Sequence, residues 1–273
     1  MSQADVDQLA RWRTLGARRS AEVLDIAPRV LASGRLSDSE QLAVAAIDMG
    51  QIGVATIRLL EAKFRKSPRV DILLGLRLEA HGEVEKARQI YERLLKEDQC
   101  NVSAHRRLIA ISPNPIPPLV RYLDTFHTDP EGWSLLADLY ADDGAYAQSM
   151  TALGQLMLLQ TWDAQAVERA GETAYTSGDL QLALKYFLRA IEMATAPEGN
   201  TIPQNTRAWW GVKQCAERLL ANPKMETSVP DKDITKPDTL RKLDALAAQM
   251  ILKPEGRSLR LRRQALGEAQ VAK

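Results

Sequence analysis

One arrangement of small residues occurs four times along this chain and constrains its fold more than any other feature. In the stretch from Leu74 to Leu95, apolar residues at helical spacing form a stripe on either side of Gly82, which can take the positive φ that ends a helix. Gly75 and Ala87 are small at the points where two antiparallel helices would approach most closely. Three quartets repeat the spacing of Gly75, Gly82, Ala87 and Tyr91: Ala43, Gly50, Ala55 and Leu59; Ala137, Gly144, Ser149 and Leu153; Gly171, Gly178, Ala183 and Phe187. The spacing predicts an array of helical hairpins.

This spacing is typical of the tetratricopeptide (TPR) motif, a helix–turn–helix unit of roughly 34 residues. The copy around Trp133 and Tyr140 matches the motif most fully, and it departs from it at Ser149, where the motif prefers alanine. We therefore predict an all-α fold, a right-handed α-solenoid of about five to six TPR-like repeats with flanking helices.

The sequence also suggests where the array begins and ends. We expect N-terminal capping helices over 1–35, the TPR solenoid over 36–220, a linker over 221–239, and a C-terminal helix with a basic tail over 240–273. Pro28 complicates the end of the first segment. Four prolines between Pro113 and Pro118 predict a rigid loop, followed by a helix from Leu119 to Phe126. The linker, polar and with three prolines, is expected to be mobile, and the terminal helix, with Leu243, Leu246, Ala247 and Met250 on one face, to cap the array.

Charge and cysteine usage narrow the class of protein. With 36 basic and 35 acidic residues, the chain has no overall field that would attract nucleic acid. The longest apolar stretch, 42–57, is interrupted by Asp48 and Gln51, which argues against a transmembrane helix. Cys100 and Cys215 give no disulfide framework, and the N-terminus lacks the apolar core of a signal peptide. These features favour a soluble, cytosolic protein.

No catalytic set emerges from the sequence, and we expect neither enzymatic activity nor a cofactor. Phosphate-binding glycine loops, nucleophile elbows and the two-histidine zinc motif do not occur. Cys100 and His105 are five residues apart, but no second pair follows at ligand spacing, so a surface imidazole and a partly buried thiol explain them better than a metal site.

Function is therefore expected on a surface. In TPR arrays the first helix of each repeat lines a concave groove that holds a segment of another protein. The motif places the following residues on that groove: Arg69, Ile72, Leu76, Glu79, Arg106, Glu131, Ser134, Asp138, Asp142, Gln165, Glu168, Glu172 and Tyr175. The first members of this set are mixed and apolar and the last members acidic, which suggests a ligand segment that is apolar at one end and basic at the other. Ordinary solvated carboxylates would explain the acidic members equally well.

A chaperone-binding groove is a known use of TPR domains, and the sequence argues against it. Such grooves clamp a C-terminal carboxylate with lysine and asparagine at set first-helix positions. The matching pairs here are Glu40 and Val44, Ile72 and Leu76, Arg106 and Ala110, Ser134 and Asp138, and Glu168 and Glu172. None is a lysine–asparagine pair.

Several stretches carry a more specific signature than the repeat itself. They are Arg11-Trp12-Arg13, Arg69-Val70 with Gly75 to Ala80, Ile90 to Asp98, Ala104 to Ile111, Trp133 with Leu136 to Tyr140, Tyr186-Phe187 with Ala190, and Asn205 to Gly211. In these stretches the chain resembles the family of subunit 2 of the endoplasmic reticulum (ER) membrane protein complex, over about 9–220.

The resemblance implies a non-catalytic scaffold on the cytoplasmic face of the ER membrane. In that family the solenoid organises the cytosolic segments of the other subunits, and the complex inserts tail-anchored and multipass proteins. It implies attachment to the membrane through partners, without a transmembrane segment in this chain. A free cytosolic TPR adaptor is the alternative, distinguished by whether the protein fractionates with membranes. An RNA-binding repeat would need a basic groove, and the groove residues above are largely acidic or neutral.

Overall fold

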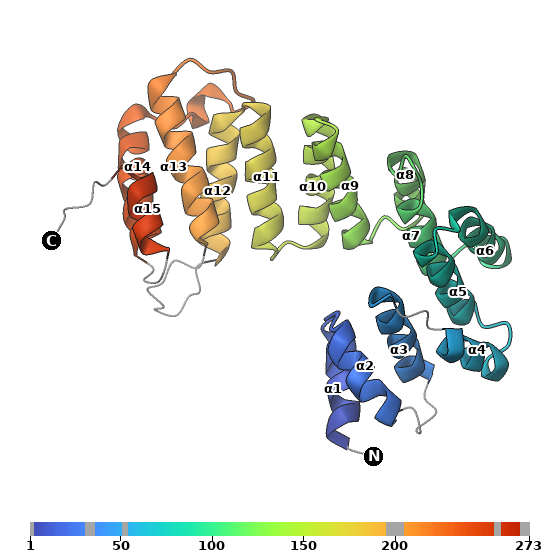
Figure 1. Cartoon of the computed structure of the whole chain (residues 1–273). Coiled ribbons are helices and arrows are strands. Elements are labelled where there is room, and N and C mark those ends of the chain that lie inside the picture. Colours follow the sequence, from blue (N-terminus) through green and yellow to red (C-terminus); the bar gives the residue numbers. More distant parts are fainter. Residues whose placement is uncertain (1–2, 31–35, 51–53, 195–204, 254–257, 268–273) are drawn as a thin grey trace. The chain divides into compact units, whose positions relative to one another are not determined.

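The computed structural model describes residues 3–30, 36–50, 54–194, 205–253 and 258–267, apart from the side chains of 27–29, 36–38 and 54–56. Within these ranges the regular structure is helical, α1 to α15 with one short 3-10 turn, as the predicted all-α fold requires (Figure 1). No helix in the described ranges combines the length and the apolar character needed to span a bilayer. The chain divides into two compact units, 1–118 and 119–273, which are described separately.

The first unit contains two flanking helices and two hairpins. The flanking helices are α1 (Gln3–Thr14) and α2 (Ser20–Val30). The hairpins pair α3 (Leu36–Asp48) with α4 (Val54–Lys63), and α5 (Pro68–Ala80) with α6 (Val84–Glu97). The next first helix, α7 (Val102–Ala110), packs on α6. Its N-cap is Asn101, whose side chain accepts a hydrogen bond from the backbone N–H of Ala104.

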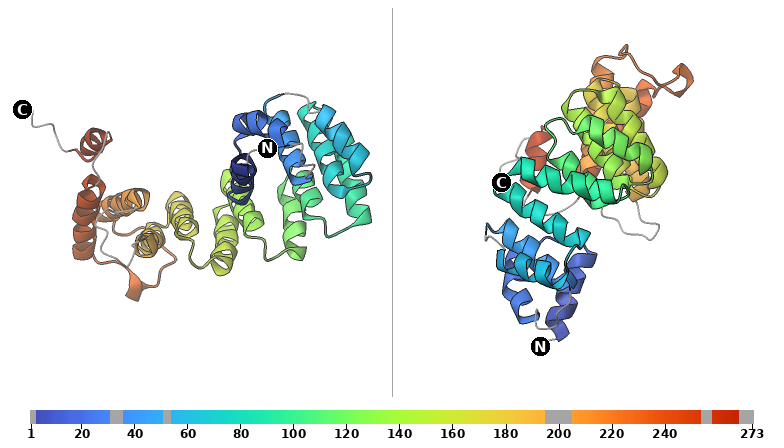
Figure 2. Two further views of the ribbon diagram at one scale, coloured as in Figure 1. Left: turned by 90° about the horizontal axis from the view of Figure 1, so that it is seen from below. Right: turned by 90° about the vertical axis from the view of Figure 1, so that its right-hand side faces the viewer.

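The second unit is a row of antiparallel helices (Figure 1), viewed nearly along their axes in the left panel of Figure 2. After α8 (Ile116–Thr125) come the hairpins α9 (Pro130–Asp142) with α10 (Tyr146–Leu159) and α11 (Ala164–Ser177) with α12 (Leu180–Ala194). Then follow α13 (Thr206–Ala221), α14 (Pro237–Leu252) and α15 (Leu259–Ala265). Asp129 and Asp163 cap α9 and α11 by accepting backbone N–H bonds at their first turns.

The hairpin turns are alike because each ends its first helix at a glycine. Gly82, Gly144 and Gly178 have φ values of 78°, 74° and 95°. In each case the residue after the glycine donates its backbone N–H to the carbonyl five positions earlier, the bond that closes a Schellman cap. The predicted turn positions are thereby confirmed at these three copies.

The predicted small-residue positions pack as expected in three copies. Ala87 and Tyr91 are fully buried, as are Ala137 with Leu153 and Ala183 with Phe187. The departure at Ser149 is accommodated because its hydroxyl donates to the Ala137 carbonyl at 2.8 Å across the hairpin. That bond spans the same twelve residues as the predicted Gly75–Ala87 approach.

Two predicted core positions are wrong. Leu59 is 70% exposed, and Ile57 and Leu60 take the buried positions of α4 instead, which shifts its register by one residue. Leu246 is 42% exposed, and the buried face of α14 runs through Leu240, Ala247 and Ile251.

The proline-rich predictions also need correction. Helix α8 begins at Ile116, three residues before the predicted start, because Pro117 and Pro118 fall in its first turn, where the missing N–H has no helical partner. The segment 222–236, predicted to be a mobile linker, lies against α12 and is called the strap below. Val229 of the strap is buried, and Thr235 donates its N–H to Gln181.

The apolar face of α13, the first helix of the last repeat, is covered by other helices of the same chain. Trp209 and Val212 of α13 are buried in the core formed with α12 and α14, and Lys213 pairs with Asp244 of α14 at 2.6 Å. Gly211 lies against the Phe187 ring, so it is the small residue at which α13 approaches α12 most closely. Helix α14 therefore caps the described array, as predicted for the terminal helix.

Candidate partner-binding face

The residues predicted to line the groove lie on the first helices of the hairpins, α5, α7, α9 and α11. In the first unit, Arg69 is exposed and pairs with Glu40 of α3. Ile72 and Leu76 are half-buried, and Arg106 is exposed. Burial acts to raise the pKa of the Glu40 carboxyl, and this effect outweighs the neighbouring cations of Arg69 and Arg13.

Glu79 is not a surface groove residue but the centre of a half-buried polar cluster. The Tyr91 hydroxyl of α6 donates to Glu79 Oε1 at 2.5 Å. Arg107 of α7 donates to both carboxylate oxygens, with Nε–Oε1 at 3.1 Å. Burial, together with the hydrogen bond to Glu79, raises the pKa of Tyr91 well above its ordinary range. The cluster joins three helices, and its carboxylate has little capacity left for a ligand.

In the second unit, Arg169 of α11 reaches back to α9. Its guanidinium donates to the Ser134 hydroxyl at 2.7 Å, to the Ser134 carbonyl at 3.2 Å, and to the Asp138 carboxylate. Two predicted groove residues are therefore brought together by an arginine that the sequence analysis did not single out.

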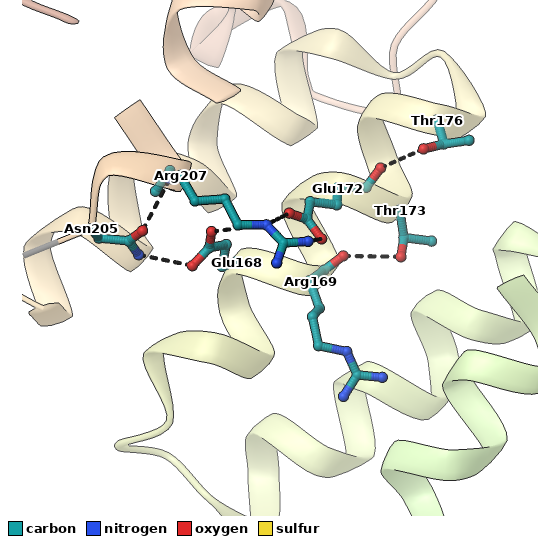
Figure 3. A network of polar contacts seen from close by, with 8 residues as sticks. Glu168, Arg169, Glu172, Thr173, Thr176, Asn205 and Arg207 are labelled. Carbon is teal, nitrogen blue, oxygen red and sulfur yellow. Dashed lines mark hydrogen bonds and ion pairs between the residues drawn. The ribbon is translucent and has the colours of Figure 1, made fainter. Parts of the chain in front are cut away.

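Arg207 of α13 has the same role in the following repeat (Figure 3). It donates through Nε and Nη2 to the two oxygens of Glu172, with Nη2–Oε2 at 2.8 Å. The hydrogen bond and charge of Glu172 raise the pKa of Arg207. Glu168 is buried, accepts from Asn205 Nδ2 at 2.9 Å, and has its Oε1 3.6 Å from Arg207 Nε.

These contacts form a repeated ladder: an arginine on one first helix binds a carboxylate on the first helix before it. The pairs are Arg69 with Glu40, Arg107 with Glu79, Arg169 with Asp138, and Arg207 with Glu172. We call this set the arginine ladder. Its signal in the sequence is an arginine on α5, α7, α11 and α13, 28 to 35 residues after an acidic partner, whereas α9 carries no arginine. The ladder neutralises much of the predicted acidic groove.

The remaining predicted residues differ in their environment. Glu131 and Gln165 are exposed near the starts of α9 and α11. Tyr175 is half-buried beneath Arg218, whose guanidinium carbon lies 4.7 Å from the ring centroid. Asp142 is exposed at the end of α9 and has no ion-pair partner among the described residues.

The ranges described by the structure contain no group of three metal-ligating side chains. His105 Nε2 lies 3.0 Å from the Gln99 carbonyl, and Cys100 is exposed rather than partly buried as expected. Cys215 is buried, which raises the pKa of its thiol to about 12.

Comparison with known proteins places this architecture in context. No protein-family model matches the chain. It is 30% identical to ER membrane protein complex subunit 2 of Xenopus tropicalis over 246 aligned positions, which cover 84% of this chain and 80% of the relative. It is 27% identical to the TPR repeat protein oca3 of Schizosaccharomyces pombe over 66% of each chain.

Among solved structures, the fold is similar to the C-terminal part of a TPR repeat-containing protein from Cytophaga hutchinsonii. The TM-score is 0.56 at 14% identity, covering 93% of this chain and 98% of that one. This likeness supports the TPR α-solenoid fold, and the subunit 2 match covers 84% of the chain. The chain belongs to the family of ER membrane protein complex subunit 2.

Proposed function

We propose that this protein is a non-catalytic scaffold subunit of an ER membrane protein complex, bound at the cytoplasmic face of the membrane. In this role it holds the cytosolic segments of the other subunits, and the complex inserts tail-anchored and multipass membrane proteins. The observation that carries the proposal is the 30% identity to subunit 2 over 84% of the chain. We include in this proposal the domain boundaries predicted from the sequence, with the TPR solenoid at 36–220.

The architecture suits a scaffold. Within each unit the arginine ladder joins neighbouring first helices, and α14 covers the apolar end of the second unit, so the first helices of each unit are held together by contacts within the chain. A face ordered before binding loses less conformational freedom when a partner segment docks on it.

The first test is purification of the tagged chain from membranes solubilised in mild detergent, with mass spectrometry of the proteins that accompany it. Stoichiometric recovery of several multi-spanning membrane proteins is expected. Recovery of soluble proteins only, with the tagged chain absent from the membrane pellet, would reject the proposal in favour of a free cytosolic TPR adaptor.

The insertion role needs a separate measurement. Cells depleted of the chain are expected to insert less of a tail-anchored reporter whose lumenal end carries a glycosylation site, while a secreted reporter is glycosylated normally. Complementation with the wild-type chain should restore the tail-anchored reporter. Unchanged insertion in cells that lack the chain would contradict the insertion role.

A further inference from the structure

Two adjoining hollows lie between α9, α10 and α11. The first, of about 370 Å³, is at the amino-terminal ends of α9 and α11 and includes Pro130, Leu135 and Gln165 in its lining; we call it the amino hollow. The second, of about 270 Å³, is at their carboxyl-terminal ends and includes Asp142, Tyr146 and Thr176; we call it the carboxyl hollow. Asp138 and Arg169 line both, so their bridge divides one continuous depression.

The charge of the depression is strongly one-sided. Its walls hold the carboxylates of Glu131, Asp138, Asp142, Asp163 and Glu172, and among the described residues the only cation lining them is Arg169. Asp138 is bound by Arg169 and Glu172 by Arg207, whereas Asp142 has no cationic partner in the described ranges of the chain.

Other features make the carboxyl hollow the part of the depression that favours a cation most. Helices α9 and α11 both end there, so their last carbonyl groups add partial negative charge to that of Asp142. Tyr146 also lines this hollow. A lysine or arginine side chain fits this chemistry.

The amino hollow differs because it presents apolar surface. Leu135 is 44% exposed in its wall, beside Pro130, Leu156 and Ala166. The acidic groups near it serve the helix starts, since Asp163 accepts the backbone N–H of Gln165. An apolar side chain would cover Leu135 there.

We infer that this depression binds an extended segment of a partner protein, with a basic side chain in the carboxyl hollow and an apolar one in the amino hollow. Leu135 and Asp142 are seven residues apart on α9, or about 10 Å along the helix, a distance that an extended chain covers in about three residues. The segment's apolar and basic residues are therefore about three positions apart. The inference rests on the proposed function, because it describes how the scaffold holds a partner, and it moves the expected basic contact from Glu168 and Glu172 to Asp142.

The test uses the purified full-length chain and fluorescein-labelled peptides of serine and glycine that carry one leucine and one arginine. The two residues are placed one to six positions apart, and matched peptides carry glutamate in place of arginine. Fluorescence anisotropy at low salt is expected to show the tightest binding near a separation of three. Binding should weaken as salt is raised, since the contact is ionic, and the glutamate peptides should not bind.

Two variants make the test specific. Asp142→Lys is expected to weaken binding of the best arginine peptide at least about tenfold. Asp143→Lys carries the same charge change on the next residue, which lies outside both hollows, and should leave the affinity within about twofold of wild type. Equal affinities of the two variants, no preference of the wild-type chain for arginine over glutamate, or no binding at any separation would overturn the inference. Circular dichroism confirms that both variants are folded.

This outcome is separable from the proposed function. Membrane co-purification of the wild-type chain tests the scaffold role without reference to the hollows. Copurification together with equal peptide affinities of Asp142→Lys and Asp143→Lys would retain the scaffold and reject the binding site. If Asp142→Lys weakened peptide binding and Asp143→Lys did not, but no membrane proteins copurified, the binding site would be retained and the scaffold role rejected.

Discussion

The Phe187 ring is held between two glycines. A Cβ added to Gly211 would lie 2.6 Å from the ring, and one added to Gly171 would lie 2.9 Å from it on α11. Because the ring is buried and enclosed from both helices, it cannot move away from a new methyl group. We expect Gly211→Ala to lower the free energy of unfolding by about 1–3 kcal/mol, the usual cost of overpacking a core, as measured by urea denaturation with far-UV circular dichroism.

Gly154 provides the matched control in the same unit. It lies inside α10, its φ is not positive, and a Cβ there would meet nothing within 4 Å. Gly154→Ala is therefore expected to stabilise the protein by about 0.5–1 kcal/mol, because alanine loses less conformational freedom in a helix. If Gly211→Ala and Gly154→Ala changed the free energy of unfolding in the same direction, the close approach at Phe187 would be contradicted.

Among the elements, the strap owes its position to one carboxylate. Asp179 directly precedes α12 and accepts hydrogen bonds from the Thr227 hydroxyl at 2.7 Å, from the Ser228 N–H at 2.8 Å and from the Ser228 hydroxyl at 2.6 Å. Asp179→Asn removes the charge that strengthens these bonds, at a cost of about 1–3 kcal/mol. We expect faster tryptic cleavage after Lys232 of the strap. Glu226→Gln, the same loss of charge on an exposed strap residue away from the cleaved bond, should leave the cleavage rate unaltered.

The same contacts give the strap a pH dependence. Burial acts to raise the pKa of Asp179, but the hydrogen bonds from Ser228, Thr227 and the backbone outweigh it and hold the pKa below its ordinary value. A carboxyl group with a lowered folded pKa stabilises the fold above its unfolded pKa of about 4, and this contribution is lost as the pH falls through the folded value. The protection factors of the strap amides against hydrogen exchange, which correct for the slower intrinsic exchange at low pH, should therefore fall below about pH 4 in the wild type, beyond the change shown by Asp179→Asn. Parallel profiles would exclude Asp179 as the titrating group.

These elements show what the sequence could and could not predict. Hairpins with a glycine turn and two small residues were predictable, because Gly82, Gly144 and Gly178 act through their own backbone and nearby carbonyls. The strap was not, because its acceptor Asp179 lies 48 and 49 residues before Thr227 and Ser228, and polar residues with prolines resemble a linker. The buried position on α4 was predicted one residue too early because Leu59 and Leu60 are both apolar, and only packing decides which of them is buried.

In the candidate site, too, local features could be predicted from the sequence and long-range contacts could not. The sequence placed Ser134, Asp138, Glu168 and Glu172 correctly on first helices, since helical periodicity fixes which residues share a face. It could not assign their partners, because Arg169 and Arg207 come from the following repeat. The sequence therefore overstated the negative charge at Glu172, which is paired with Arg207, and gave no special weight to Asp142. Asp142 lacks a cationic partner among the described residues, and only the fold reveals this.

At the scale of the whole molecule, a solenoid couples each hairpin mainly to its neighbours. In the second unit α12 packs against α11 and α13, whereas α9 contacts α10, and α10 contacts α11. Gly211→Ala disturbs the Phe187 contact shared by α11, α12 and α13. Hydrogen exchange with mass spectrometry is therefore expected to show protection falling about tenfold or more in α12 and α13, with less than about twofold change in α9. An equal loss from α9 to α14 would mean that the second unit opens as one cooperative body, and that the proposed binding site between α9, α10 and α11 is only as stable as the most distant hairpin of the unit.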